Sequence, residues 1–167
     1  MADRRGHVYV TALWRISSFD DLEGIGGERS SGRWHTASPD KRILYASEHP
    51  ALALIEVLVN LQAATQFIPA TYQLIKIAIS GPVSTRILPP ESLSPEWRNK
   101  KTETRFLGDA WLAESRTALL GVPSAPCPES TNYLLNPLHP DVKQLRVEWS
   151  RWIEYDNRFF NTRPHST

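Results

Sequence analysis

Residues 44–59, LYASEHPALALIEVLV, restrict the fold more than any other stretch of the sequence. The stretch starts with a short strand pattern, and Pro50 suits the first turn of a helix, with Ser47 or His49 at the capping position. Residues 51–61 are apolar nearly all round, which predicts a helix that is buried on most of its sides.

Strand patterns lie on both sides of this helix. Alternating apolar residues, or an enrichment in β-branched and aromatic residues, predict strands over residues 8–16, 71–79, 83–88 and 145–152. Arg15 lies near the end of the first of these strands. Three prolines after the third strand, Pro89, Pro90 and Pro95, predict a surface loop that carries Trp97.

A second helix is predicted over residues 107–120, because apolar residues there recur at helical spacing and Gly121 is suited to end it. The order of the elements predicts an α+β fold: a single domain with a bent, largely antiparallel sheet and flanking helices. We expect this domain to cover residues 1–160 and residues 161–167 to form a frayed tail.

Composition excludes several classes of protein. The 167 residues include 19 Lys and Arg and 18 Asp and Glu, so the formal net charge is +1, which argues against coating of nucleic acid or anionic lipid. The longest apolar stretch is too short to cross a bilayer, and no secretory signal is visible, so we expect a cytoplasmic protein without membrane contact.

No metal site is predicted. A single cysteine, Cys127, cannot form an internal disulfide or a paired-cysteine site. The histidines also lack the spacing of a helical zinc site; they are His7, His35, His49, His139 and His165.

Glu56 is the most informative residue for function. It lies in the centre of the apolar helix, where an unpaired carboxylate costs several kcal/mol, so it needs partners or a pocket. Alternatively, Glu56 lies on a narrow solvated stripe of the helix with Asn60, four residues later.

Arg33 follows the glycine- and serine-rich part of a polar segment, residues 17–39, that is long enough to indicate a functional loop. Its guanidinium is suited to grip a phosphate with paired hydrogen bonds, or it is an ordinary exposed arginine stacked on Trp34. Arg15 and Arg29 are candidate second cations, although each alone is typical of a surface salt bridge.

Three further side chains are candidates for ligand contact. Tyr45 precedes the helix closely enough to share a cleft with Glu56, where its ring stacks on a planar group or is part of the core. Ser124 follows a proline and is suited to bind a phosphate or a sugar hydroxyl. Asn132 either binds a ligand or stabilises a turn.

Together these segments resemble the RES-domain toxins, a family named after an Arg, a Glu and a Ser, which match Arg33, Glu56 and Ser124. The similarity covers nearly the whole chain. It is carried by Gly32-Arg33-Trp34, Leu44-Tyr45-Ala46-Ser47, Ala51 through Glu56, Val122-Pro123-Ser124 and Asn132-Tyr133-Leu134-Leu135-Asn136-Pro137-Leu138-His139-Pro140. The family commonly has Asn after the Trp and a Gly two or three residues later, where this chain has His35, Ala37 and Ser38.

The resemblance implies an ADP-ribosyltransferase-like fold and the toxin of a toxin–antitoxin pair that consumes NAD⁺ as its substrate, without a metal. Its implied partner is an Xre-type helix-turn-helix antitoxin, so that DNA is contacted only through the antitoxin, with a homodimer of the toxin within the complex. The toxin is expected to cleave the nicotinamide N-glycosidic bond by hydrolysis or phosphorolysis.

The chemistry of the residues agrees with this activity. Cleavage passes through an oxocarbenium-like ribose, whose positive charge Glu56 would stabilise. Arg33, with Arg15 as a weaker candidate, would bind the pyrophosphate, and Tyr45 would pack on the nicotinamide or its ribose. Ser124 and Asn132 are expected to hydrogen-bond the ligand.

Two other functions remain open. A mono-ADP-ribosyltransferase would share the same pocket and transfer ADP-ribose to a host protein. A non-catalytic nucleotide- or partner-binding domain would use Glu56 for structure alone.

Overall fold

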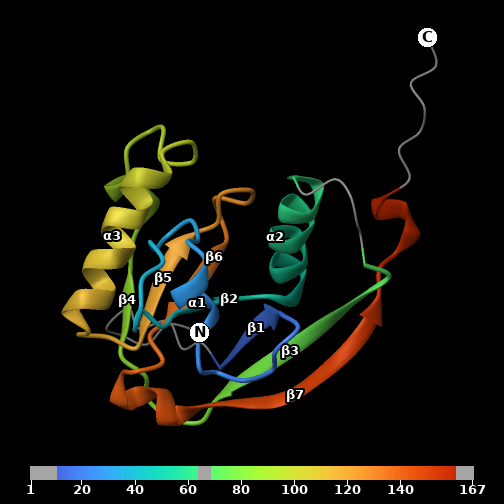
Figure 1. Cartoon of the computed structure of the whole chain (residues 1–167), viewed down its shortest axis with the longest axis horizontal. Coiled ribbons are helices and arrows are strands. Elements are labelled where there is room, and N and C mark those ends of the chain that lie inside the picture. The colour runs from blue at the N-terminus through green and yellow to red at the C-terminus, as the bar shows by residue number, and fades with distance from the viewer. Residues whose placement is uncertain (1–10, 64–68, 161–167) are drawn as a thin grey trace.

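Seven strands form one mixed sheet in the part of the chain that the computed structural model describes, residues 11–63 and 69–160 (Figure 1). The strands are β1 (Ala12–Ile16), β2 (Leu44–Ser47), β3 (Thr71–Ile79), β4 (Thr85–Ile87), β5 (Leu119–Pro123), β6 (Thr131–Leu135) and β7 (Leu145–Glu154). Their order in the sheet is β4-β5-β6-β2-β1-β3-β7. β4 and β5 run parallel, and the remaining neighbours run antiparallel.

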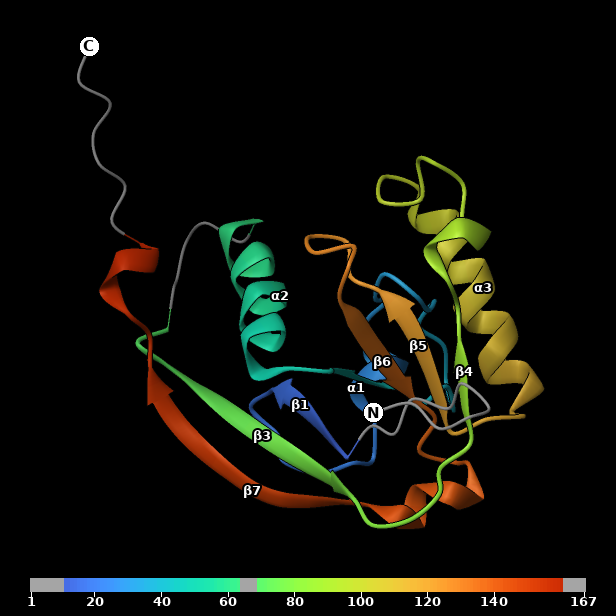
Figure 2. The same ribbon diagram turned by 180° about the vertical axis from the view of Figure 1, so that it is seen from behind.

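The sheet bends between β2 and β1, because the register of these two strands contains a single pair, Trp14 with Ser47. The other antiparallel neighbours pair along most of their length, and β3 and β7 form a long curved ribbon that extends away from β4, β5 and β6 (Figure 2). The prediction of a bent, largely antiparallel sheet in an α+β fold is therefore confirmed.

Two long helices flank the sheet on its two halves. α2 (Pro50–Ala63) stands over β1 and β2, and α3 (Lys101–Glu114) lies beside β4 and β5 (Figures 1 and 2). The His49 side chain caps α2 by accepting a hydrogen bond from the Ala51 N–H at 3.2 Å. The shorter helical segments are α1 (Gly26–Arg29) and the 3₁₀ turns Pro90–Ser92, Pro140–Gln144 and Asn157–Phe159.

The apolar core has two clusters. One lies on the sheet, around Leu13, Ile75 and Ile77. The other lies under α3 and contains three tryptophans, Trp34, Trp97 and Trp111, with apolar residues of β5 and β6. Trp97, expected on a surface loop, is instead buried, because its ring packs against that of Trp34 with 6.0 Å between centroids.

The second helix differs from the prediction of residues 107–120. It begins at Lys101 and ends at Glu114, where Ser115 adopts a left-handed conformation with φ 47°. Residues 119–123 form β5, which is buried throughout. A short apolar run has the same pattern in a buried strand as in a helix. The prediction therefore extended the helix past the turn at Ser115 into β5.

The other predicted elements agree with the structure in type. β3 has the predicted bounds, β7 extends two residues beyond its prediction, and the strand predicted over residues 83–88 is shorter. The predicted loop over residues 17–39 contains α1. Residues 8–10 of the first strand and the predicted tail, residues 161–167, lie outside the described residues.

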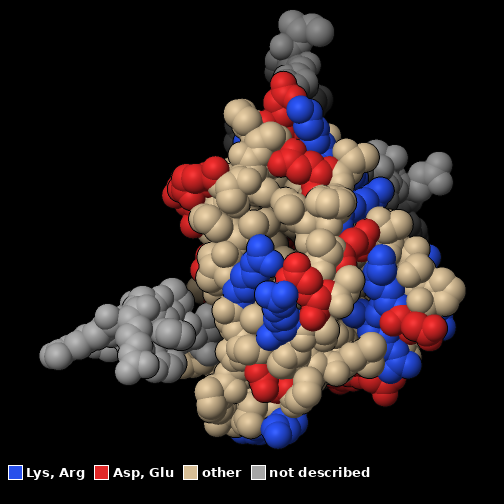
Figure 3. Space-filling view, turned by 90° about the vertical axis from the view of Figure 1, so that its left-hand side faces the viewer, with Lys and Arg blue, Asp and Glu red and all other residues tan. Residues whose placement is uncertain are grey.

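Within the described residues, every helix is too short or too polar to span a membrane. The face of the molecule that carries α3 shows Lys and Arg side chains interspersed with Asp and Glu, without one large field of a single sign (Figure 3).

Candidate active site

A cavity of about 950 Å³ lies between the two halves of the fold. Its walls come from the ends of β1 and β2, from α2, from residues 31–34 and from residues 95–105. Such a volume is at the upper end of the about 300–1,000 Å³ typical of ligand pockets. The cavity brings together most of the residues predicted from the sequence, namely Arg15, Arg33, Tyr45, Glu56 and Asn132.

Glu56 projects from α2 and is held through one of its two oxygens. Oε1 accepts hydrogen bonds from the Ser124 hydroxyl at 2.7 Å and from the Asn132 side-chain amide. The amide oxygen of Asn132 in turn accepts from the Ser47 hydroxyl at 2.6 Å. Oε2 accepts no hydrogen bond from the described residues, so this oxygen is left for a ligand.

Ser124 is fully buried, so its hydroxyl contacts Glu56 from the protein interior and not from the cavity. Its hydroxyl donates to Glu56 and accepts from the Cys127 N–H at 3.2 Å, so both of its hydrogen-bonding roles are used within the protein. Asn132 lies in β6 rather than in a turn, and it lines the cavity beside Glu56. In place of the solvated stripe considered as an alternative, Glu56 lines the cavity and accepts hydrogen bonds from Ser124, directly after β5, and from Asn132 of β6.

Arg33 faces Glu56 from residues 31–34, which have no regular secondary structure. Its Nη1 donates to the Arg98 carbonyl at 2.9 Å, and its own carbonyl accepts from the Thr104 hydroxyl at 2.7 Å. Burial lowers the pKa of Arg33, while the charge of Glu56 raises it, so the two side chains interact electrostatically. The guanidinium remains charged at neutral pH.

Tyr45 lies on β2 with its ring against the cavity and its hydroxyl turned toward the loop. The hydroxyl is 2.8 Å from the His35 ring and accepts from the Trp34 N–H at 3.1 Å. Burial raises the pKa of Tyr45, so the phenol is neutral at physiological pH. Tyr45 is therefore both a packing residue and a wall of the cavity.

Arg15 stands where this cavity meets a second one of about 480 Å³, which the glycine-rich residues 24–27 line. Its Nη2 donates to the Ser17 hydroxyl at 3.1 Å, whereas its buried Nη1 has no hydrogen-bond partner among the described residues. Burial lowers the pKa of Arg15, and Asp21 partly opposes this effect. A buried guanidinium with a free donor is suited to bind an anion.

Sequence reasoning missed three further cations that line the cavity, Arg98, Lys101 and Arg105. The basic run at residues 98–101 is a signal, but such runs usually form a solvated surface. Arg105 also donates from Nε to the Gly32 carbonyl at 2.9 Å, a contact between residues 73 positions apart that no local pattern indicates. Among the described residues, no group of three His, Cys, Asp or Glu is placed to hold a metal ion.

The fold and the cavity define a class: an α+β protein in which a held carboxylate faces an arginine across a pocket lined by cations. The chain belongs to the RES domain family, whose model matches residues 12–156. The resemblance noted in the sequence is thereby confirmed.

Relatives and a solved structure agree with this assignment. The chain is 42% identical over 148 residues to "Toxin Res" of Pseudomonas putida, covering 89% of this chain and 99% of that protein. It is 35% identical over 160 residues to the "Prs ADP-ribosylating toxin" of a Sphingobium species, covering 89% and 96%. The fold matches a chain of the Mycobacterium tuberculosis MbcT–MbcA toxin–antitoxin complex with a TM-score of 0.73 at 19% identity, covering 86% of this chain and 84% of that one.

Proposed function

We propose that this protein is the toxin of a toxin–antitoxin pair and that it depletes NAD⁺ by cleaving the nicotinamide N-glycosidic bond, through hydrolysis or phosphorolysis. The observation that carries the proposal is the convergence of Arg33 and Glu56 on one cavity from opposite walls. The family assignment and the names of the relatives support the toxin role.

The charges that line the cavity match the charges of NAD⁺. The pyrophosphate is dianionic, and Arg33 is the cation best placed to grip it with paired hydrogen bonds. Arg15 supplies a second guanidinium with a free donor, and Arg98, Lys101 and Arg105 add positive potential at the same wall. Tyr45 offers its ring to the nicotinamide or the ribose.

Glu56 assists the cleavage of the glycosidic bond. The bond between the ribose C1′ and the nicotinamide nitrogen breaks, and its electron pair leaves with neutral nicotinamide. The oxygen of water or of phosphate then bonds to C1′, and the proton of the attacking group is released to solvent. Oε2 of Glu56 stabilises the positive ribose in this step, while Ser124 and Asn132 hold Oε1. Ser124 thus acts through Glu56 rather than on the ligand.

The proposed partner is an Xre-type helix-turn-helix antitoxin that covers the cavity, so that DNA is contacted only through it. The similarity of the fold to a chain of a toxin–antitoxin complex supports an antitoxin partner. The proposal also places the toxin in the cytoplasm, where NAD⁺ is its substrate, with no metal in the reaction, and allows a homodimer within the complex.

Transfer of ADP-ribose to a protein is the second candidate, favoured by the relative named "Prs ADP-ribosylating toxin". The same bond breaks, but a nucleophilic side chain of the acceptor replaces water or phosphate at C1′. Transfer of label from adenine-labelled NAD⁺ to protein in a lysate distinguishes this reaction from hydrolysis.

The test is the loss of NAD⁺ with purified protein, with and without phosphate, followed by mass spectrometry of the products. Glu56→Gln keeps the shape of the side chain but loses the charge, so we expect turnover to fall by about 10²–10³-fold with little change in NAD⁺ affinity. Arg33→Ala is expected to weaken NAD⁺ binding about tenfold or more, because it removes a charge-assisted contact with the pyrophosphate.

Matched controls are Glu91→Gln and Arg86→Ala, which change exposed residues outside the cavity. Both are expected to behave as the wild type. If the wild type leaves NAD⁺ intact under both conditions and transfers no label to protein, NAD⁺ consumption is refuted. Equal NAD⁺ binding by Arg33→Ala and the wild type, measured by calorimetry, would remove Arg33 from the pyrophosphate role.

A further inference from the structure

His35 is a buried titratable residue that the proposed reaction does not use; its exposed fraction is 2%. We propose that His35, in its neutral form, is the positioning residue that holds the Arg33 loop, residues 31–34, by accepting hydrogen bonds at Nδ1. The expected effect of His35 on NAD⁺ binding rests on the proposed function, whereas the effect of His35 on the Arg33 loop can be measured without NAD⁺.

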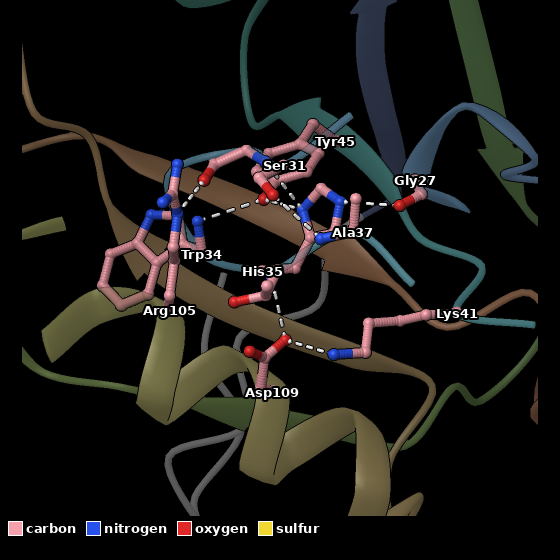
Figure 4. Close-up of polar contacts among 11 residues, drawn as sticks. Gly27, Ser31, Trp34, His35, Ala37, Lys41, Tyr45, Arg105 and Asp109 are labelled. Carbon is pink, nitrogen blue, oxygen red and sulfur yellow. Dashed lines mark hydrogen bonds and ion pairs between the residues drawn. The ribbon is translucent and has the colours of Figure 1, made fainter. Parts of the chain in front are cut away.

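The contacts of the ring determine which nitrogen carries the proton (Figure 4). Nε2 lies 3.1 Å from the Gly27 carbonyl, which can only accept, so Nε2 carries the hydrogen and donates. Nδ1 lies 3.2 Å from the Gly32 N–H, which can only donate, so Nδ1 is the acceptor. A single tautomer satisfies both contacts.

The Tyr45 hydroxyl completes the arrangement. It accepts from the Trp34 N–H at 3.1 Å, so its own hydrogen is directed to His35 Nδ1 at 2.8 Å. The two amides that flank Arg33, those of Gly32 and Trp34, are therefore both tied to His35, one directly and one through the tyrosine.

The close packing of this arrangement restricts Gly32. A Cβ at this position would lie 3.0 Å from His35 Nδ1 and would clash with the Tyr45 hydroxyl. On its other side, the Gly32 carbonyl accepts from Arg105 of α3. The Arg33 backbone is thus held between β2 and α3 by side chains that meet it from both sides, which orients the guanidinium toward the cavity.

Protonation would remove the acceptor, because an imidazolium donates from both nitrogens. The groups that face His35 are Asp109 from α3, Lys41 from the segment before β2 and Tyr45 from β2, together with the backbone of Gly27 in α1 and of Ser30 directly after it. Burial lowers the pKa of His35 below its ordinary value of 6.5, which keeps the ring neutral at physiological pH.

Two substitutions separate the two ring nitrogens. In His35→Asn the side-chain oxygen can take the place of Nδ1 as acceptor, while the contact with Gly27 is lost. In His35→Gln the side-chain amide can reach the Gly27 carbonyl, while the acceptor at Nδ1 is lost. Neither side chain titrates, and a residue that only filled space would be affected similarly by both changes.

The primary measurement is hydrogen exchange of the Gly32 and Trp34 amides by NMR, expressed as protection factors. At pH 7 we expect His35→Asn to retain the protection of the wild type and His35→Gln to lose it at least about tenfold. Acidification that protonates the His35 ring, followed by its nitrogen-15 shifts, should release both amides in the wild type, whereas the same pH should not release them in His35→Asn. Nitrogen-15 shifts of the ring should show Nδ1 unprotonated at pH 7, with the His35 signals identified by their loss in His35→Asn.

Equal protection in the wild type and both variants would overturn the proposal, as would a ring that carries its proton on Nδ1 at pH 7. NAD⁺ affinity is the secondary measurement, expected to follow the order wild type, His35→Asn, His35→Gln, with at least about tenfold between the last two. If the wild type binds no NAD⁺, the proposed function fails, and the amide protection still decides the role of His35.

Discussion

The two walls of the cavity are built in different ways. The Glu56 wall consists of α2, β2 and β6, and its carboxylate accepts hydrogen bonds from Asn132 of β6 and from Ser124, the residue after β5. The Arg33 wall is a loop without regular structure, held by side chains of α3 and β2. Both walls join segments far apart in the chain, but Glu56 and Asn132 lie within a helix and a strand, whereas Arg33 lies in a loop.

This difference predicts that perturbing α3 disturbs the Arg33 wall and leaves the Glu56 wall intact.

Gly108 is expected to give the largest effect on stability. A Cβ at this position would clash with the Trp34 carbonyl oxygen, and a backbone atom cannot move aside without a large cost. Gly108→Ala should therefore destabilise the protein by about 3 kcal/mol, measured by urea unfolding, and should reduce the protection of the Trp34 amide.

Gly26→Ala in α1 is the matched control, because a Cβ there meets nothing within 4 Å. We expect its stability to change by less than about 1 kcal/mol. Similar unfolding free energies for the two variants would show that α3 does not press against the Arg33 wall.

A substitution of Ser124 perturbs the Glu56 wall. Ser124→Ala leaves the Cys127 N–H without its acceptor and Glu56 Oε1 with Asn132 as its remaining side-chain donor, at a cost of about 1–3 kcal/mol. Because Glu56 would then be less well oriented, kcat for NAD⁺ cleavage should fall about tenfold while KM, which depends on the Arg33 wall, stays nearly constant.

Ser150→Ala provides the control, since Ser150 hydrogen-bonds to Asp20 at the surface of the molecule, away from the cavity lining. It should leave both constants unchanged. A raised KM with an unchanged kcat in Ser124→Ala would contradict the assignment of kcat to the Glu56 wall and KM to the Arg33 wall. It would indicate that Ser124 binds the ligand directly.

The same contrast explains how much the sequence could predict. β3 and α2 follow from patterns within a dozen residues and agree with the structure in type. The prediction that this helix is buried on most of its sides is wrong, because Ile55 and Val59 are exposed. The end of α3 did not follow, because the apolar residues of β5 resemble a continuation of the helix. Local patterns therefore predict the elements of the Glu56 wall, but not the contacts of Glu56 with Ser124 and Asn132, which lie 68 and 76 residues later in the chain.

The Arg33 wall could be predicted only in part. Arg33 itself was indicated by the glycine-rich loop before it, but its supports Thr104 and Arg105 lie about 70 residues later in the chain. His35 gave no signal of its role, since a lone histidine has no periodicity. Contacts of this kind arise from the packing of α3 on the loop, which no segment of sequence encodes by itself.

Asp109 is expected to give the smallest effect, because it contacts Thr36 and Lys41, which follow the Arg33 loop. Its Oδ1 accepts from the Thr36 N–H at 3.0 Å and from Lys41 Nζ at 2.9 Å. Burial raises the pKa of Asp109, but these contacts outweigh it and hold the pKa below its ordinary value of 3.8. A carboxylate with a lowered pKa stabilises the folded state above its unfolded pKa, and this stabilisation is lost as the pH falls through the folded pKa.

Asp109→Asn keeps an acceptor for Thr36 and removes the charge that Lys41 faces, so it should cost less than about 1 kcal/mol at pH 7. The difference from the wild type should stay constant down to about pH 5 and narrow below about pH 4, where the wild-type carboxyl also becomes neutral. Urea unfolding across this range, combined with Lys41→Met in a double-mutant cycle, separates the ion pair from the contact with Thr36. A cost above about 2 kcal/mol that is unchanged in the Lys41→Met background would mean that the charge acts mainly through Thr36, and the Arg33 wall would then depend on Asp109 far more than on an ordinary surface ion pair.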